Sequence, residues 1–276
     1  MNYAFYEGFT KLYMEQGIEA TASFAKEHHY SSVEMFKDAV GYKTHSAPEN
    51  PAEVKVVKKV LDAAGLPVAC YSVYADARLP ETKQRLMEQA EIVAELECPF
   101  LHHMLLPYLD VTDNSDYPEA IKIALDVAIA VANRAEELGI TCIYEDQGFY
   151  VNGVEGFGGF FKIMKETCKN VGVCMDFGNI LFADEKPEAF LDAYRADVRH
   201  VHVKDYLRKK APASPGVYWL RDTIIGDGVI DFAAGMKILN EIGYRGAFAL
   251  EIGHPEPFEV GIRQAMDCLT PLYDPK

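Results

Sequence analysis

The sequence is poor in basic residues, which limits the partners that the protein can bind. Lys and Arg together number 27 against 42 Asp and Glu, so the formal net charge is −15. A protein that binds nucleic acid neutralises phosphates with clustered Lys and Arg, and we therefore expect no nucleic-acid partner. A small anionic substrate stays compatible with this balance, because charges inside a pocket outweigh the distant average.

Long apolar segments and paired cysteine motifs are also missing. No stretch approaches the roughly 20 apolar residues that span a bilayer. The opening MNYAFYEGFTKLY lacks the basic and apolar parts of a signal peptide. The six cysteines are scattered without a C-x-x-C pair, several of them inside apolar runs, which favours buried free thiols over disulfides. These absences predict a cytoplasmic protein without a membrane partner.

The chain does contain a repeated unit, in which an amphipathic helix ends near a Gly and a β-rich run follows within a few residues. Gly suits the left-handed turn that commonly ends a helix, and the pattern places Gly65, Gly139, Gly172 and Gly243 at such ends. Apolar residues at helical spacing predict a helix over residues 118–138 with one buried face.

Eight β-rich runs punctuate the chain, and most are continuously apolar, as expected for parallel strands covered on both sides. The runs are Tyr3–Glu7, Ser32–Phe36, Val68–Val73, Pro99–Leu105, Thr141–Glu145, Gly172–Asp176, Val198–Val203 and Ala247–Glu251. Eight strand–helix units and no dividing linker predict a single-domain α/β protein over residues 1–276, a (β/α)₈ TIM barrel. The main alternative, a doubly wound open sheet, lacks a G-x-G-x-x-G after the first strand. Residues 209–228 predict a long loop after the seventh strand, and such loops are usually functional.

Four consecutive predicted strands have, at or near their carboxyl ends, side chains of the types that commonly bind metal ions. They are Glu145, Asp176, His202 and Glu251. In a barrel, polar side chains at the carboxyl ends of strands face the active site. A buried carboxylate needs a compensating partner, and a divalent cation supplies one for all four residues together.

The donor set of three carboxylates and one imidazole suits Mn²⁺, Mg²⁺ or Co²⁺ with open positions for a substrate. We expect one Mn²⁺, with Mg²⁺, Co²⁺ and Zn²⁺ as alternatives, and no organic cofactor. Each residue alone has a simpler explanation, as a salt bridge, a helix cap or a core histidine, and ion networks can mimic metal sites. That explanation has to hold four times in succession, so we favour the metal site.

Several segments resemble the xylose-isomerase-like barrel superfamily of sugar and sugar-phosphate isomerases and epimerases. They are SVEMF, IYED, CMDFGN, HVHVKD, GDGVIDF and GYRGAFALE. The resemblance covers nearly the whole chain; its motifs are moderately specific for the superfamily and much less so for one reaction. It implies the same four metal ligands, a small carbohydrate as substrate, and the homodimers or homotetramers common among relatives.

By this resemblance the protein is a metal-dependent isomerase or epimerase of a ketose, a ketose phosphate or a related hydroxy-carbonyl compound. Glu145 and Glu251 match two catalytic carboxylates that move protons beside a metal-bound carbonyl. The alternative is a dehydratase or lyase on a cyclic polyol or keto-sugar, like the inosose and dehydroshikimate dehydratases of the superfamily. Apurinic-site endonucleases share the barrel but use several additional His ligands, one of which Asn179 replaces. A non-catalytic sugar-binding barrel would have lost the metal ligands.

Further polar residues near the strand ends are candidates for substrate binding. Asn179 stands where many relatives carry a His that contacts the substrate. Lys204 and Arg208 follow His202 and could bind substrate oxygens or a phosphate, although loop cations are more often solvated. His102 and His103 point to opposite sides of a regular strand; we take His102 as the candidate, although the spacing does not decide between them. Tyr6, Glu34 and Gln147 are strand-end neighbours that could line the pocket or form hydrogen bonds at its rim.

Overall fold

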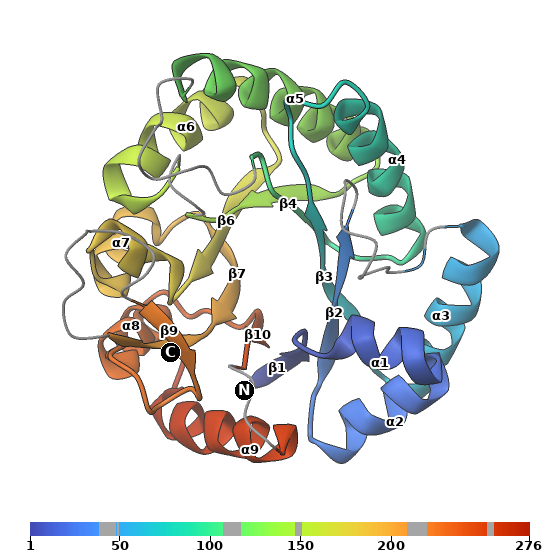
Figure 1. Ribbon diagram of the computed structural model, residues 1–276, viewed down its shortest axis with the longest axis vertical. Helices are drawn as coiled ribbons and strands as arrows, with labels where there is room; N and C mark the ends of the chain where they lie inside the picture. The colour runs from blue at the N-terminus through green and yellow to red at the C-terminus, as the bar shows by residue number, and fades with distance from the viewer. Residues whose placement is uncertain (39–47, 49, 107–116, 147–150, 209–219, 253–256) are drawn as a thin grey trace.

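The computed structural model describes residues 1–38, 48, 50–106, 117–146, 151–208, 220–252 and 257–276. Eight parallel strands within these ranges close into a barrel, and helices surround it (Figure 1). Around the barrel the strands are β1 (Asn2–Phe5), β10 (Ala247–Leu250), β7 (Val198–Val203), β6 (Val171–Asp176), β5 (Thr141–Tyr144), β4 (Phe100–His103), β3 (Val68–Tyr74) and β2 (Ser32–Asp38). The predicted (β/α)₈ TIM barrel is confirmed.

The described helices form the outer ring. They are α1 (Phe9–Gln16), α2 (Ile18–Glu27), α3 (Pro51–Ala64), α4 (Thr82–Glu95), α5 (Tyr117–Glu137), α6 (Gly153–Thr167), α7 (Pro187–Tyr194), α8 (Phe232–Glu241) and α9 (Phe258–Leu269), with 3₁₀ turns η1 (Asn179–Ala183) and η3 (Thr270–Leu272). No helix in these ranges is long and apolar enough to cross a membrane.

Helix ends follow local chemistry at most of the predicted positions. At α3, the Asn50 side chain accepts a hydrogen bond from the Glu53 amide, Pro51 occupies the first turn and Gly65 ends the helix with a φ of 66°. Gly139 and Gly243 also have positive φ. Gly172 was predicted wrongly as a helix end, because it lies inside β6. The position favours glycine because of packing, since an added Cβ would lie 2.5 Å from Arg199 Cγ.

The two faces of the barrel strands differ in chemistry. Residues such as Met35, Tyr71 and Leu250 point outward and join the main apolar core, which also contains buried helix residues such as Leu61. The interior face carries small or polar side chains instead. It includes Ala4, Cys70, Glu34, Ser72, His102, Cys174, His200, His202 and Ala249, all buried. A barrel whose interior is polar toward the carboxyl ends of its strands can hold a charged site there.

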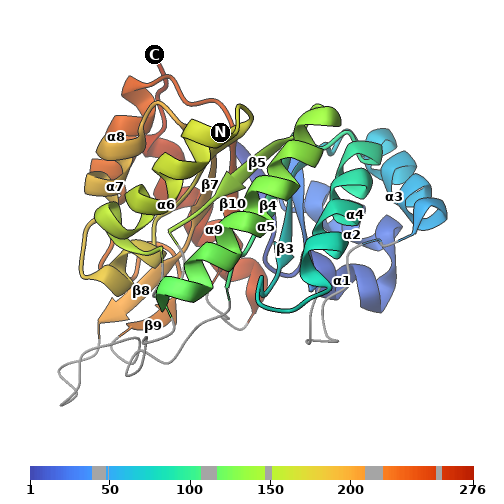
Figure 2. The same cartoon turned by 90° about the horizontal axis from the view of Figure 1, so that it is seen from above.

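The region after β7 contains more regular structure than the sequence predicted. Residues 209–228 were expected to form one long loop, but Leu220–Thr223 forms strand β9, which pairs antiparallel with β8 (Asp205–Arg208). The loop prediction was therefore wrong for this segment; residues 209–219 lie outside the described residues. The β8–β9 hairpin lies at the end of the barrel opposite the two chain termini (Figure 2).

Candidate metal centre

Three carboxylates from three strands converge on one nitrogen of His202. Its Nδ1 lies 3.2 Å from Glu251 Oε1, 3.3 Å from Glu145 Oε2 and 3.9 Å from Asp176 Oδ2. Glu145 and Glu251 directly follow β5 and β10, and Asp176 is the last residue of β6. The four residues that the sequence predicted as ligands are thus brought together at the carboxyl ends of adjacent strands.

Three atoms that could bind an ion at this point are buried without a hydrogen bond of acceptable geometry. Glu145 Oε2, Asp176 Oδ2 and His202 Nδ1 are all inaccessible to solvent and receive no hydrogen bond of acceptable geometry. Buried polar atoms without partners are rare in folded proteins. Oxygen and nitrogen lone pairs that face one another in this way fit a cation between them, and the set is rich in the hard oxygen donors that divalent ions prefer.

Lys204 is the cation that the chain itself places beside the cluster. Its Nζ lies 2.8 Å from Glu251 Oε2 and 3.0 Å from Asp176 Oδ2. One ammonium group does not neutralise three carboxylates, even beside a His202 ring whose pKa neighbouring groups hold above its usual range against burial, so negative charge remains for a divalent ion. The side chains of Lys204 and Glu251 are 15% and 21% exposed, whereas Asp176 is fully buried. The centre therefore opens to solvent on the side of Lys204 and Glu251.

Burial and charge act on these groups in opposite directions. Burial raises the pKa of Asp176 to about 6, although Lys204 opposes the rise. At Glu251 burial also opposes ionisation, but Lys204 and His202 outweigh it and lower the pKa to about 2. The ammonium of Lys204 is favoured by the same pairing, because Asp176 and Glu251 outweigh burial and hold its pKa well above the usual range. Lys204 thus favours the ionised forms of both Asp176 and Glu251.

Local backbone structure fixes Asp176 and Lys204. Asp176 Oδ1 accepts hydrogen bonds from the amides of Gly178 and Asn179 at 2.7 and 2.8 Å, which turns Oδ2 toward the centre. A Cβ at Gly178 would meet Lys204 Cγ at 2.3 Å. Glycine at position 178 therefore leaves the space that the Lys204 side chain occupies beside Asp176.

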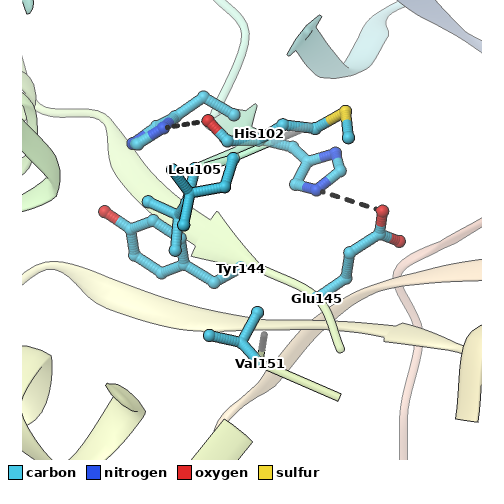
Figure 3. Close-up of a pocket in the computed structure, with 8 residues that line it drawn as sticks. His102, Leu105, Tyr144, Glu145 and Val151 are labelled. Atoms are coloured by element: carbon cyan, nitrogen blue, oxygen red, sulfur yellow. Dashed lines mark hydrogen bonds and ion pairs between the residues drawn. The ribbon is translucent and has the colours of Figure 1, made fainter. Parts of the chain in front are cut away.

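The structure distinguishes the two histidines of β4. His102 points toward Glu145, with 3.6 Å between Nε2 and Glu145 Oε1 (Figure 3). His103 packs edge-on against Tyr144, and burial lowers its pKa to about 4. His102 is therefore the histidine of this pair that faces the carboxylate cluster. Both border a pocket with a hydrophobic wall that includes Leu105 and Val151.

Two of the other predicted substrate-binding residues reach the centre. Asn179 Oδ1 accepts a hydrogen bond from Lys204, and its buried Nδ2 has no partner. Tyr6 stacks on His202 with ring centroids 5.1 Å apart. Arg208 does not join them: it is exposed at the end of β8 and forms an ion pair with Asp184. Gln147 lies outside the described residues.

Residues 22–272 match the family described as the xylose isomerase-like TIM barrel. The chain belongs to this family. The inosose dehydratase of Clostridium beijerinckii is 27% identical over 269 residues, covering 86% of this chain and 88% of that protein. The D-psicose 3-epimerase of Clostridium cellulolyticum H10 shares the fold with a TM-score of 0.77 at 14% identity, covering 99% of this chain and 100% of that one. The IOLI protein with a bound zinc atom has a TM-score of 0.73 at 15% identity, covering 99% and 100%.

In this xylose isomerase-like barrel, one motif of the resemblance has a structural explanation. Asp205, which follows Lys204, accepts hydrogen bonds from the amides of Tyr206, Gly226, Gly228 and Ile230. A Cβ at Gly228 would meet Asp205 Oδ1 at 2.0 Å, so a side chain is excluded there. The Asp of HVKD and the glycines of GDG therefore hold the segment around residues 226–230 against the start of β8, directly after His202 and Lys204.

The sequence interpretation missed a group of buried polar residues that contact His202 from the barrel interior. Glu34, expected to line the pocket or form hydrogen bonds at its rim, is completely buried and contacts His200, His202 and Ser72. The sequence could have indicated part of this group, because His200 and His202 are two residues apart and therefore share one face of β7. The spacing within one strand could not reveal that Glu34 and Ser72 lie opposite them across the barrel.

Proposed function

We propose that this chain is a divalent-metal-dependent dehydratase that acts on a cyclic polyol or keto-sugar bearing a carbonyl group. The observation that carries the proposal is Lys204, an ammonium group paired with Glu251 at the open side of the carboxylate cluster. Elimination of water needs a base for a C–H proton and an acid for the departing hydroxyl. The site offers both kinds of group.

Glu145, Asp176, His202 and Glu251 would hold the ion, with Mn²⁺ as our first choice and Mg²⁺, Co²⁺ and Zn²⁺ as alternatives. When bound, a divalent ion polarises a carbonyl group and stabilises negative charge that develops beside it. The unpartnered buried atoms of this cluster support its role as the binding site. The non-catalytic alternative gains no support, because all four donors are in place.

Glu145 is the base that we assign to proton removal. It lies deep in the site, and His102 faces its second oxygen. The pKa of both carboxylates lies below the usual range despite burial, but Glu251 is also in direct contact with Lys204 at 2.8 Å, which leaves it less free to accept a proton from the substrate. We therefore assign Glu251 to holding Lys204 and the ion.

Lys204 is the acid that we assign to the leaving group. Asp176 and Glu251 hold its pKa high despite burial, but a departing hydroxide is a stronger base than the amine that remains, so the proton still moves to it. Glu145 takes the proton from the carbon beside the carbonyl, the electron pair forms a carbon–carbon double bond, and the β-hydroxyl departs with a proton from Lys204 as water. The substrate thus yields an unsaturated ketone and water without an oxidant. Asn179 Nδ2, a buried donor without a partner, together with Tyr6 and His102, would bind substrate oxygens.

The sequence relatives support the same reaction class. The matched curated proteins from Clostridium beijerinckii, Geobacillus thermodenitrificans and Clostridium botulinum are named inosose dehydratases. At 26 to 27% identity they support the class of reaction more than the substrate.

An isomerase or epimerase is the second candidate, which the sequence interpretation placed first. Glu145 and Glu251 both lie within 3.3 Å of His202 Nδ1, so two carboxylates remain available for transfer of a proton on and off a carbon. The epimerase structures of similar fold are compatible with this reaction, but a similarity at 14% sequence identity is evidence for the fold only.

The reaction can be identified with Mn²⁺-loaded protein and a panel of inososes, ketoses, ketose phosphates and hydroxypyruvate, followed by NMR in D₂O. We expect loss of water from an inosose or related keto-polyol, with the ultraviolet absorption of an unsaturated ketone. Deuterium incorporation with every hydroxyl retained would instead establish the isomerase or epimerase. Turnover of none of these compounds by protein that contains bound Mn²⁺ would contradict both candidates.

A further inference from the structure

Glu34 lies at the centre of the barrel and contacts three side chains from two other strands. Its Oε2 lies 2.6 Å from His200 Nε2, and its Oε1 lies 3.0 Å from His202 Nε2 and 2.5 Å from Ser72 Oγ. None of these four side chains is more than about 1% exposed. Such a buried carboxylate is stable only if its oxygens receive hydrogen bonds.

An ionised carboxylate has no hydrogen to give, so each of its partners must donate. His202 therefore carries a proton on Nε2. Its other nitrogen, Nδ1, is the atom around which Glu145, Asp176 and Glu251 converge. A histidine binds a metal through a nitrogen lone pair, and the hydrogen bond on the opposite nitrogen decides which one is available. The contact with Glu34 thus directs Nδ1 to the centre.

The same assignment of hydrogen-bond donors and acceptors applies to His102, which Ser72 links to Glu34. The Ser72 hydroxyl has one proton, which it donates to Glu34. Its oxygen also lies 2.9 Å from His102 Nδ1, so in this contact His102 must donate. His102 then presents Nε2 as an acceptor toward Glu145, 3.6 Å away. Hydrogen bonds therefore run from His202 and Ser72 to Glu34 and from His102 to Ser72, while His102 Nε2 and Glu145 Oε1 face each other as two acceptors.

We propose that Glu34 is a positioning residue that keeps a proton on His202 Nε2 and, through Ser72, on His102 Nδ1, so that His202 Nδ1 and His102 Nε2 are the nitrogens that face the site. This inference rests on the metal site of the proposed function and assigns a role to a residue outside the ligand set. Glu34 does not contact substrate or ion; it acts through the two imidazoles.

Titration of metal-stripped protein with Mn²⁺ by calorimetry tests the contact with His202. Glu34→Gln keeps the shape of the side chain but replaces one acceptor oxygen with a donor. We expect its Mn²⁺ affinity to fall about 10- to 100-fold, the usual effect of losing a hydrogen-bond partner of a metal-binding histidine. An affinity equal to that of the unaltered protein would overturn the proposal, as would two Mn²⁺ bound per chain with one lost on the substitution, which would make Glu34 a ligand.

Ser72→Ala is the matched control, because it removes the link to His102 and leaves the Glu34–His202 contact in place. Its Mn²⁺ affinity should be unchanged, while kcat at saturating Mn²⁺ should fall because His102 is free to take the other tautomer. If Ser72→Ala loses Mn²⁺ affinity as strongly as Glu34→Gln, a general loosening of the core explains both results and the proposal fails.

NMR of the unaltered protein tests the same proposal without relying on variants, which could fold poorly. In the Co²⁺-loaded protein, the proton on the free nitrogen of a coordinated histidine gives a strongly shifted NMR signal. We expect one such signal that exchanges slowly with D₂O, because the Nε2 proton of His202 is buried against Glu34. A bound Co²⁺ without this signal would overturn the inference alone. Failure of the unaltered protein to bind either ion would instead overturn the metal site.

Discussion

Glu145→Gln is expected to lower kcat by about 10²- to 10⁴-fold, the usual contribution of a positioned general base. The amide keeps an oxygen toward the ion but cannot take a proton from the substrate. Solvent deuterium should therefore also fail to enter substrate or product. The assay is steady-state turnover of the identified substrate at Mn²⁺ concentrations that calorimetry shows to be saturating, so that weaker ion binding does not mimic lost catalysis.

Glu155→Gln provides the matched control for this experiment. Glu155 is an exposed carboxylate in the first turn of α6, the helix that follows β5, and its loss should leave kcat unchanged. Full turnover by Glu145→Gln with Mn²⁺ bound would show that Glu145 is not the base. The proton acceptor would then have to be sought in another residue, with His102 the first to test.

Lys204→Met should reduce dehydration by a similar factor of about 10² to 10⁴, because the departing hydroxyl loses its proton donor. Removal of the C–H proton by Glu145 does not need Lys204. The variant should therefore still exchange that proton for deuterium in D₂O while it forms little unsaturated product. NMR of the recovered substrate measures exchange and elimination in the same sample.

Arg208→Met is the comparison for Lys204→Met, because it removes a cation four residues further along the chain. Arg208 is exposed and paired with Asp184 rather than with the centre, so we expect kcat to be unchanged. A large rise in KM in this variant would support the substrate-binding role that the sequence suggested. Wild-type dehydration by Lys204→Met would contradict its assignment as the acid and favour a different proton donor.

The carboxylate cluster could be predicted from the sequence because barrel geometry brings successive strand ends together. Glu145, Asp176 and Glu251 each end an apolar run and His202 lies one residue before the end of its strand, and each strand boundary was predicted to within about two residues. Knowledge of the fold class then sufficed to place the four side chains near one another. The cytoplasmic location and the oligomeric state stay predictions.

The contacts beneath the cluster could not be predicted in the same way. Glu34, Ser72 and His102 lie on three neighbouring strands, and their meeting with His202 depends on strand register across the closed barrel. The register shifts at Val33/Glu34 and Val173/Cys174, irregularities that a pattern of apolar residues does not encode. The β9 strand was missed because its four residues follow a segment with two prolines, which favoured a loop.

Calorimetric titration of metal-stripped protein with Mn²⁺, alongside the Asp176→Asn variant, tests the metal centre most directly. Asp176 contributes a buried, charged oxygen that lies 3.0 Å from Lys204 and faces His202, so its neutral substitute should bind the ion much more weakly. We predict one Mn²⁺ per chain in the unaltered protein and a large loss of affinity in the variant. Absence of binding by the unaltered protein, or equal binding by Asp176→Asn, would contradict the assignment of this cluster as a metal site.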